Sequence, residues 1–176
     1  MIEIEAKFMI DDSEFSRIDN LLSEIAELVI EKEEVDIYYK HPLRDFAKTD
    51  EAFRIRKDVE GVTITYKGKK MDPETKTREE IKVRIYGDDY DNARDMFRKL
   101  GFEEFATVRK IRKIYRMDNA IICLDTLDFG KFIEIEVDTQ DIEEGKRKIS
   151  EIAKKINLSG KNIRKSYLEL MLGDSA

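Results

Sequence analysis

Basic residues alternate with apolar residues in several short segments of this 176-residue sequence. Arg54 and Arg56 flank Ile55, for example, so both basic side chains would lie on the same face of a strand. Guanidinium groups bind phosphate oxygens through two parallel hydrogen bonds, and ammonium groups bind them as point charges. The pattern therefore favours a surface that binds a compact polyanion such as a triphosphate. The candidate phosphate-binding residues are Lys7, Arg54, Arg56, Lys67, Lys76, Arg78, Lys82, Arg84, Lys110 and Arg112.

Acidic residues occur two positions apart in two of these segments. Glu3 and Glu5 form one pair, and Glu134 and Glu136 form the other. The strand period of two directs both carboxylates of a pair to the same side. Carboxylate oxygens suit Mg²⁺ or Mn²⁺ bound to substrate phosphates, so we predict that these four residues are metal ligands. An acidic pair on a strand is, however, more often an ordinary solvent-facing surface.

Hydropathy periods predict the elements that must position these residues. Alternation predicts strands at 2–9, 28–40, 52–59, 62–68, 75–86, 102–116, 119–125 and 131–138. A period of three to four predicts helices at 12–27, from 88 or 89 to 100, at 142–156 and at 162–172. With two Pro and no flexible linker, the chain 1–176 is predicted to be a single domain. Eight antiparallel strands with few helices favour an α+β fold, a closed β-barrel with helices packed outside.

The order of one strand, one helix and three strands occurs twice in this prediction. The two halves align faintly at an offset of 77 residues, where Glu3 meets Glu80 and Lys7 meets Arg84. A duplication and chance similarity in a sequence rich in Ile, Asp and Lys explain this alignment equally well.

A closed barrel would convert the charged strand faces into its lumen. The ten basic residues would then share the lumen with Glu3, Glu5, Glu80, Asp125, Glu134 and Glu136. A solvent-facing sheet with cross-strand ion pairs explains any single strand at least as well. Nearly every strand carries such a face, however, and this favours a cationic lumen that binds an anion.

Composition excludes several other classes of protein. The formal net charge of −6 disfavours nucleic acid as a partner, and no apolar run is long enough to span a membrane. A single Cys allows no disulfide within the chain, so we expect a soluble, cytoplasmic protein. We predict that Cys123 is an unreactive thiol. His41, the only His, is predicted to have a structural or capping role, with a general base as the alternative.

Several segments together resemble one known family. Glu3-Ile4-Glu5-Ala6-Lys7 resembles the E-x-E-x-K signature of the CYTH superfamily, which includes class IV adenylate cyclases, thiamine triphosphatases and inorganic triphosphatases. Similar later blocks are Asp36-Ile37-Tyr38-Tyr39, Arg44-Asp45-Phe46, Thr49 to Arg56, Thr65-Tyr66-Lys67-Gly68, Thr77 to Glu80, Lys110-Ile111-Arg112, Leu124-Asp125, Phe132 to Glu136 and Ser166 to Leu170. The resemblance implies an eight-stranded triphosphate tunnel with two metal ions and a basic ring. It also implies catalytic roles for Lys7, Arg56, Lys110, Arg112 and Asp125.

The resemblance predicts an enzyme similar to the class IV adenylate cyclases, converting ATP to cyclic AMP and pyrophosphate with Mg²⁺ or Mn²⁺. The blocks at 36–39 and 44–46 favour this activity. Two alternatives use the same phosphate-binding residues: hydrolysis of inorganic or thiamine triphosphate, and binding of a triphosphate or polyphosphate without reaction. Tyr38, Tyr66 and Tyr167 are predicted to pack in the core, unless one of them stacks on a base.

The outward faces of the strands predict how the chain assembles. They carry Ile2, Ile4, Phe53, Ile55, Val62, Ile64, Ile81, Val83, Ile133 and Ile135. The predicted helices are too few to cover all of these residues, and large exposed apolar patches mark partner surfaces. We therefore expect a homodimer with one tunnel in each subunit, as the family resemblance also implies.

Overall fold

The computed structural model describes the backbone of residues 2–173 and the side chains of residues 4–173. Its strands are β1 (Ile2–Ile10), β2 (Glu27–Lys40), β3 (Ala52–Asp58), β4 (Gly61–Lys70), β5 (Arg78–Ile85), β6 (Glu103–Met117), β7 (Ala120–Leu127), β8 (Gly130–Val137) and β9 (Lys161–Ile163). Its helices are α1 (Asp12–Ile25), α2 (Phe46–Thr49), the 3-10 turn η1 (Gly87–Asp89), α3 (Tyr90–Lys99), α4 (Ile142–Lys155) and α5 (Tyr167–Met171). The eight predicted strands and the first three predicted helices are confirmed to within a few residues. No helix in the described part of the chain is long and apolar enough to cross a membrane.

The predicted helix at 162–172 is wrong in its first half. Lys161–Ile163 forms β9, which pairs antiparallel with β1 opposite Lys7, Phe8 and Met9. The α-helical turns begin only at Tyr167, after Ser166 caps them in a reciprocal capping box with Glu169. Pairing with a preformed strand edge thus overrides the local helical pattern.

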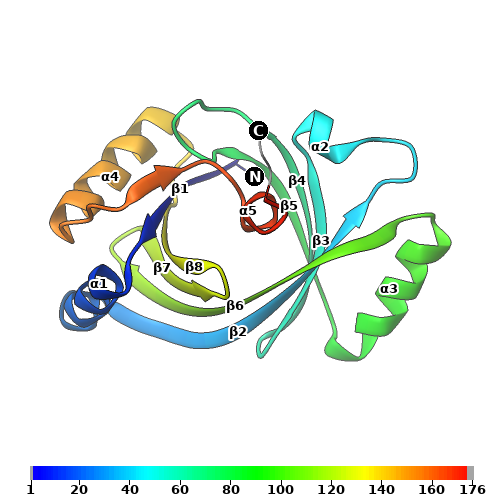
Figure 1. Cartoon of the computed structure of the whole chain (residues 1–176), viewed down its shortest axis with the longest axis horizontal. Coiled ribbons are helices and arrows are strands. Elements are labelled where there is room, and N and C mark those ends of the chain that lie inside the picture. Colours follow the sequence, from blue (N-terminus) through cyan, green and yellow to red (C-terminus); the bar gives the residue numbers. More distant parts are fainter. Residues whose placement is uncertain (1, 174–176) are drawn as a thin grey trace.

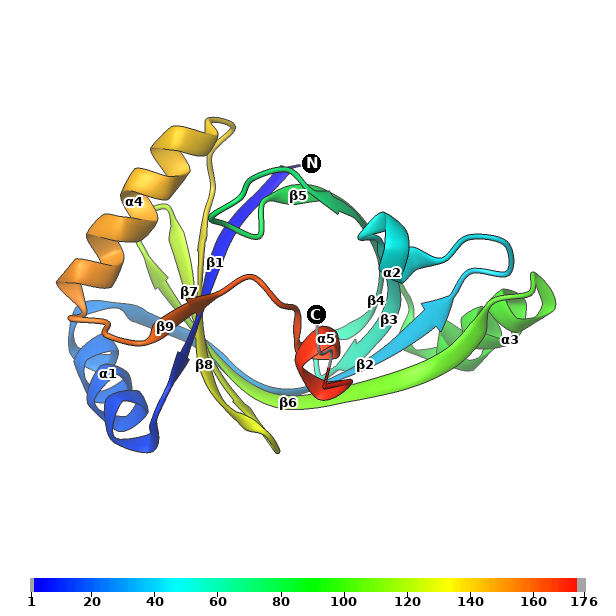
Figure 2. The ribbon, with the colours of Figure 1, turned by 45° about the horizontal axis from the view of Figure 1, so that its top comes forward.

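All strands belong to one antiparallel sheet in the order β5-β4-β3-β2-β6-β7-β8-β1-β9. The strands curve around a common centre, so β5 returns to the side of β1 (Figure 2). These two strands pair at only two positions, Ile2 with Glu79 and Glu3 with Arg78. The structure is therefore a curved, mostly antiparallel sheet with helices outside, and the predicted hydrogen-bonded closure of the barrel is not confirmed.

The strand order is symmetric about the central pair of β2 and β6. On either side of this pair lie β3 and β7, then β4 and β8, then β5 and β1. The symmetry relates the half β1-α1-β2-β3-β4 to the half β5-α3-β6-β7-β8.

Three helices cover the outer face of the sheet (Figure 1). Helices α1 and α4 lie over β1, β7 and β8, where Ile18, Leu22 and Ile149 enter the largest core cluster. Helix α4 approaches β1 so closely that a Cβ at Gly145 would lie 2.7 Å from Ile4. Helix α3 packs Ala93 and Phe97 against β2, β3 and β4.

This helical cover is more complete than the sequence suggested. Ile4, Ile55, Ile133 and Ile135, expected on an exposed apolar belt, are fully buried. On the uncovered outer face of β5, by contrast, Ile81 and Val83 are each 52% exposed. The exposed part of the predicted belt is therefore concentrated on β5.

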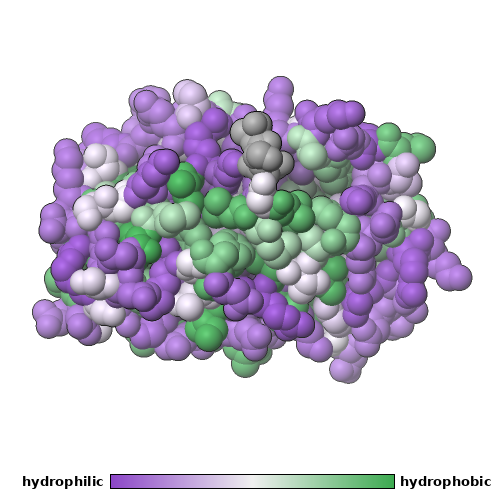
Figure 3. Space-filling view, in the orientation of Figure 1, coloured by the Kyte–Doolittle hydropathy of each residue, from purple (hydrophilic) through white to green (hydrophobic). Residues whose placement is uncertain are grey.

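The short helix α5 lies at one opening of the curved sheet, near the centre of Figure 1. Tyr167 packs against Phe132, with ring centroids 5.1 Å apart. Met171 and Leu172 are exposed, and apolar side chains gather in this part of the surface between more hydrophilic flanks (Figure 3). Helix α5 thus brings apolar residues to the edge of a polar interior.

Candidate functional site

The inner face of the sheet encloses a cavity of about 430 Å³. All ten basic residues that the sequence identified line it: Lys7, Arg54, Arg56, Lys67, Lys76, Arg78, Lys82, Arg84, Lys110 and Arg112. Nine of them project from strands, where the alternation of side chains directs them inward. Lys76 lies in the loop before β5, and its backbone N–H donates to the carbonyl oxygen of Glu5 on β1. Tertiary structure thus gathers these ten cations from five strands and one loop.

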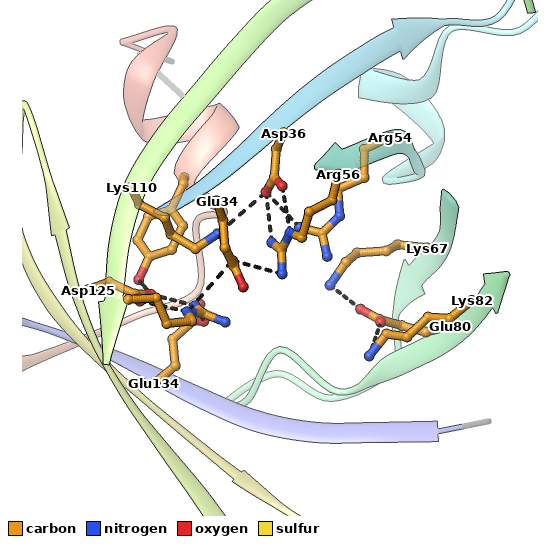
Figure 4. A network of polar contacts seen from close by, with 12 residues as sticks. Glu34, Asp36, Arg54, Arg56, Lys67, Glu80, Lys82, Lys110, Asp125 and Glu134 are labelled. Atoms are coloured by element: carbon orange, nitrogen blue, oxygen red, sulfur yellow. Dashed lines mark hydrogen bonds and ion pairs between the residues drawn. The ribbon is translucent and has the colours of Figure 1, made fainter. Parts of the chain in front are cut away.

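Asp36 on β2 connects the cations of one wall (Figure 4). Its carboxylate accepts from Nη1 of Arg54 at 2.9 Å and from Nε of Arg56 at 2.6 Å, and Nζ of Lys110 lies 3.4 Å away. Burial by itself would raise the pKa of Asp36, but Arg54, Arg56 and Lys110 hold that pKa well below its ordinary value. Asp36 is therefore ionised and fixes the positions of these cations.

Glu34, two residues before Asp36, adds a second buried acid to this wall. Its Oε2 lies 2.8 Å from Nη1 of Arg56 and 2.8 Å from Nζ of Lys110. Glu34 is not among the residues that the sequence predicts for the site, and Asp36 entered only as part of a block that resembles the family. The available signal was the alternation of Lys32, Glu34 and Asp36 along one strand. The cations of this wall are consequently more fully paired than expected from the sequence.

Glu134 on β8 is the centre of the opposite wall. Its Oε1 lies 3.3 Å from Nζ of Lys7 and 3.2 Å from Nζ of Lys76, and its Oε2 contacts Arg112. Burial opposes the ionisation of Glu134, yet Lys76, Lys7 and Arg112 hold its pKa well below the ordinary value. Burial and the nearby Lys76 lower the pKa of Lys7 well below its ordinary value. The carboxylate of Glu134 thus stays ionised next to two buried Lys side chains and the partly buried Arg112.

Two other predicted metal ligands, Glu5 and Glu136, also line the cavity. Glu5 on β1 is directly opposite Glu136 on β8, Lys76 forms an ion pair with Glu5, and both acids line the cavity with Glu134. Within residues 4–173 no three acidic, His or Cys side chains are close enough together to hold a metal ion. The side chain of Glu3 lies outside the described residues. The wall contains carboxylate oxygens, the donors that Mg²⁺ and Mn²⁺ prefer, but those of Glu5 and Glu134 form ion pairs with Lys and Arg side chains.

Asp125 is placed behind the wall of the cavity. It is fully buried, accepts from Nε of Arg112 at 2.6 Å and accepts from the Tyr167 hydroxyl at 2.6 Å. It is not among the residues that line the cavity. This geometry makes Asp125 a residue that positions Arg112, and Asp125 does not line the lumen in which the sequence placed it.

Tyr167 forms part of the cavity wall as well as the core. Nζ of Lys7 lies 3.4 Å from the centroid of its ring, within the range of a cation–π interaction. Tyr38 also lines the cavity, whereas the Tyr66 hydroxyl donates to Glu51 at 2.5 Å. The prediction that these tyrosines pack in the core is confirmed for Tyr38 and Tyr167, both of which are buried.

The wall formed by β4 and β5 is more open. Glu80 is buried and pairs with Lys67 on β4 and, at 3.0 Å, with Lys82 on β5 (Figure 4). Lys82 and Arg84 line the cavity and are also exposed to solvent. Arg78 lines the cavity and is buried. This side of the cavity therefore carries its cations next to solvent.

His41 and Cys123 lie where the sequence analysis expected. Nδ1 of His41 accepts from the backbone N–H groups of Leu43 and Arg44, each at 3.0 Å, so His41 closes a turn outside the cavity. Cys123 is buried on β7, and burial raises the pKa of its thiol far above the ordinary value. The structural role predicted for His41 is confirmed, and the burial of Cys123 supports the prediction of an unreactive thiol.

Known proteins resemble this chain over almost its whole length. Residues 1–167 match the CYTH domain. A protein of Methanocaldococcus jannaschii, provisionally named an adenylate cyclase, is 42% identical, with 97% of this chain and 98% of that protein covered. The solved structure of a Pyrococcus horikoshii protein is 38% identical and has a TM-score of 0.87, with 97% of this chain and 98% of that chain covered.

More distant structures share the fold. A Hippeastrum protein, described as having a dominant triphosphatase activity, is 18% identical and has a TM-score of 0.76, with 99% of this chain and 97% of that chain covered. The likeness at this identity concerns the fold. The matched domain spans almost the entire chain and contains all ten of the predicted basic residues that line the cavity, and the chain therefore belongs to the CYTH domain family.

Proposed function

We propose that this protein is a metal-dependent enzyme that converts ATP to cyclic AMP and pyrophosphate in its cationic cavity. The observation that carries the proposal is the convergence of ten basic residues on one cavity of about 430 Å³. Opposed walls of Arg and Lys can contact several phosphate groups at once, as a triphosphate requires. The acidic net charge of the whole chain supports a small anion as ligand in preference to nucleic acid.

Catalysis in this proposal depends on position and charge. Lys7, Arg56, Lys110 and Arg112 would hold the triphosphate and stabilise the negative charge that develops on the departing pyrophosphate. Asp125, buried behind Arg112, would keep that guanidinium pointed into the cavity. No residue of this set needs to form a covalent bond with the substrate.

The carboxylates of Glu5, Glu134 and Glu136 fit a divalent metal by their donor chemistry, and Glu3 is the fourth ligand that the sequence predicts. Bound Mg²⁺ or Mn²⁺ would supply activation of the ribose 3′-hydroxyl and neutralisation of the phosphates. In their own right, the acids keep Lys7, Lys76 and Arg112 in place within the wall.

Hydrolysis of inorganic or thiamine triphosphate is the second candidate. The fold shared with the Hippeastrum protein favours it, because that protein is described as having a dominant triphosphatase activity. The name of the more similar Methanocaldococcus jannaschii protein favours the cyclase. Both reactions use the same phosphate-binding walls, and they differ in whether a ribose hydroxyl or water attacks phosphorus.

Incubation of the purified protein with ATP, tripolyphosphate or thiamine triphosphate and Mg²⁺ or Mn²⁺ distinguishes these candidates. We expect ATP to yield cyclic AMP and pyrophosphate in equal amounts. Formation of both products should stop when EDTA removes the metal ion. Release of phosphate without cyclic AMP would reverse the ranking in favour of a triphosphatase. Tight binding without any product would identify a binding module that does not react.

We further propose a cytoplasmic homodimer with one cavity in each subunit. The exposed Ile81 and Val83 on the uncovered face of β5 support a partner surface at this strand. Light scattering at micromolar concentration should give about twice the chain mass of 20.7 kDa. Replacing Ile81 by Lys should shift the mass toward that of one chain, because it places a charge in the proposed apolar contact. A wild-type mass of one chain would contradict the proposal.

A further inference from the structure

The hydroxyl group of Thr65 is buried without a partner. Thr65 lies on β4 and is 1% exposed, and its Oγ1 has no hydrogen-bond partner among the described residues. A buried hydroxyl without a partner lowers the stability of a fold, and each such group in a native structure needs an explanation. Valine has nearly the same shape and would avoid this loss. The hydroxyl is therefore better explained by a partner from outside the chain.

The position of Thr65 indicates where that partner lies. Thr65 lines the cavity, and it is directly opposite Arg54 on β3 and Lys82 on β5. Side chains that are opposite one another on neighbouring strands lie on the same face of the sheet. Thr65 thus occupies the middle of a row between two cations.

Arg54 also has an unused hydrogen-bond donor. Its Nη1 donates to Asp36 at 2.9 Å, while its buried Nε has no hydrogen-bond partner among the described residues. The Lys82 ammonium lies 3.0 Å from Glu80, so its charge is already partly balanced (Figure 4). Two N–H or O–H donors in one row are left to bind a ligand atom.

We propose that the Thr65 hydroxyl and Nε of Arg54 together bind one non-bridging phosphate oxygen of the substrate. An anionic oxygen fits this place because it accepts from both donors and is attracted by the surrounding guanidinium and ammonium groups. The hydroxyl donates a directional hydrogen bond and adds no charge. Thr65 would therefore be a binding residue that fixes the position of the triphosphate along the cavity. This inference rests on the proposed function, since it assumes a triphosphate substrate.

Two variants of Thr65 separate the hydroxyl from the shape of the side chain. Thr65→Val removes the hydroxyl and keeps the shape, whereas Thr65→Ser keeps the hydroxyl. The probe is inorganic tripolyphosphate in the presence of EDTA, measured by titration calorimetry, so that no reaction takes place. We expect Thr65→Val to weaken binding about tenfold to a hundredfold and Thr65→Ser to change it less than about threefold. Thr126→Val on β7, which does not line the cavity, is the matched control.

Thermal unfolding of the same variants without ligand provides a second measurement. Thr65→Val should raise Tm, because it removes an unpaired buried hydroxyl. A higher Tm together with weaker tripolyphosphate binding is the result expected if the hydroxyl binds a ligand. A lower Tm would mean that the hydroxyl has a partner inside the protein and would overturn the proposal. Equal affinity in Thr65→Val and wild type, or an equal loss in Thr65→Val and Thr65→Ser, would also overturn it. Absence of cyclic AMP from the wild-type reaction concerns the proposed function alone and leaves these binding results unaffected.

Discussion

Replacing Glu134 by Gln is expected to reduce metal-dependent turnover at least about 10³-fold, which corresponds to about 4 kcal/mol of transition-state stabilisation. The amide keeps the size of the side chain and can still accept a hydrogen bond. It lacks the negative charge that a divalent metal requires of its ligands. Product formation from ATP with Mg²⁺ or Mn²⁺ measures the effect, and far-UV circular dichroism checks that the fold is retained.

Binding of tripolyphosphate in EDTA separates the metal role of Glu134 from its role in holding cations. We expect Glu134→Gln to bind tripolyphosphate at least as tightly as the wild type, because a negative charge is removed from a cavity that holds an anion. Glu33→Gln is the matched control, since Glu33 pairs with Arg109 only at 3.9 Å on the exposed side of β2. Wild-type turnover in Glu134→Gln would refute the assignment of Glu134 as a metal ligand. A collapse of tripolyphosphate binding in EDTA would instead assign the loss of turnover to displacement of Lys7, Lys76 and Arg112.

Replacing Asp36 by Asn is expected to lower the free energy of unfolding by about 3–5 kcal/mol. Asp36 is the shared partner of Arg54, Arg56 and Lys110. Without its charge these closely spaced cations, of which Lys110 is buried and the two Arg are partly buried, repel one another, and Glu34 is left to balance two of them. Urea unfolding measures the loss, and Asp91→Asn on the exposed surface of α3 should change the free energy by less than about 1 kcal/mol.

Two further measurements test whether charge is the cause of this loss. Tripolyphosphate should raise Tm more in Asp36→Asn than in the wild type, because the anion replaces the missing negative charge. The pKa of Asp36 is lowered on folding, so its stabilising contribution is present above the unfolded value of about 3.9 and is lost as the pH falls through the lower, folded value. The difference in stability between wild type and variant should therefore shrink below about pH 4. A variant as stable as the wild type at neutral pH would contradict the role of Asp36.

Local patterns were sufficient to place the strands and the direction of their side chains. Alternation identified the inward face of 52–59 through Arg54 and Arg56, and the helical period identified α1 through Ile18 and Leu22. These predictions succeed because burial of one strand face or one helix face is a property of neighbouring residues in the chain. The same alternation selected ten of the eleven described basic residues that line the cavity and missed Lys32 on β2.

Pairings between distant segments were beyond the sequence. Local pattern predicts a helix over 162–172, but the free edge of β1 offers backbone hydrogen bonds that make Lys161–Ile163 a strand. Coverage of the outer face was also misjudged, since the close approach of α4 to β1 at Gly145 depends on packing.

The sequence by itself determined the cationic character of the site, its strand-based scaffold and its family resemblance, because these follow from residue types and from their spacing along the chain. Only the tertiary structure decided which acid balances which cation. It placed Glu34 and Asp36 among the Arg and Lys side chains, moved Asp125 behind Arg112, and left the Thr65 hydroxyl unpaired inside the cavity. Such choices depend on distances between strands far apart in the chain, where a few ångströms determine whether a buried charge is paired or exposed to a ligand.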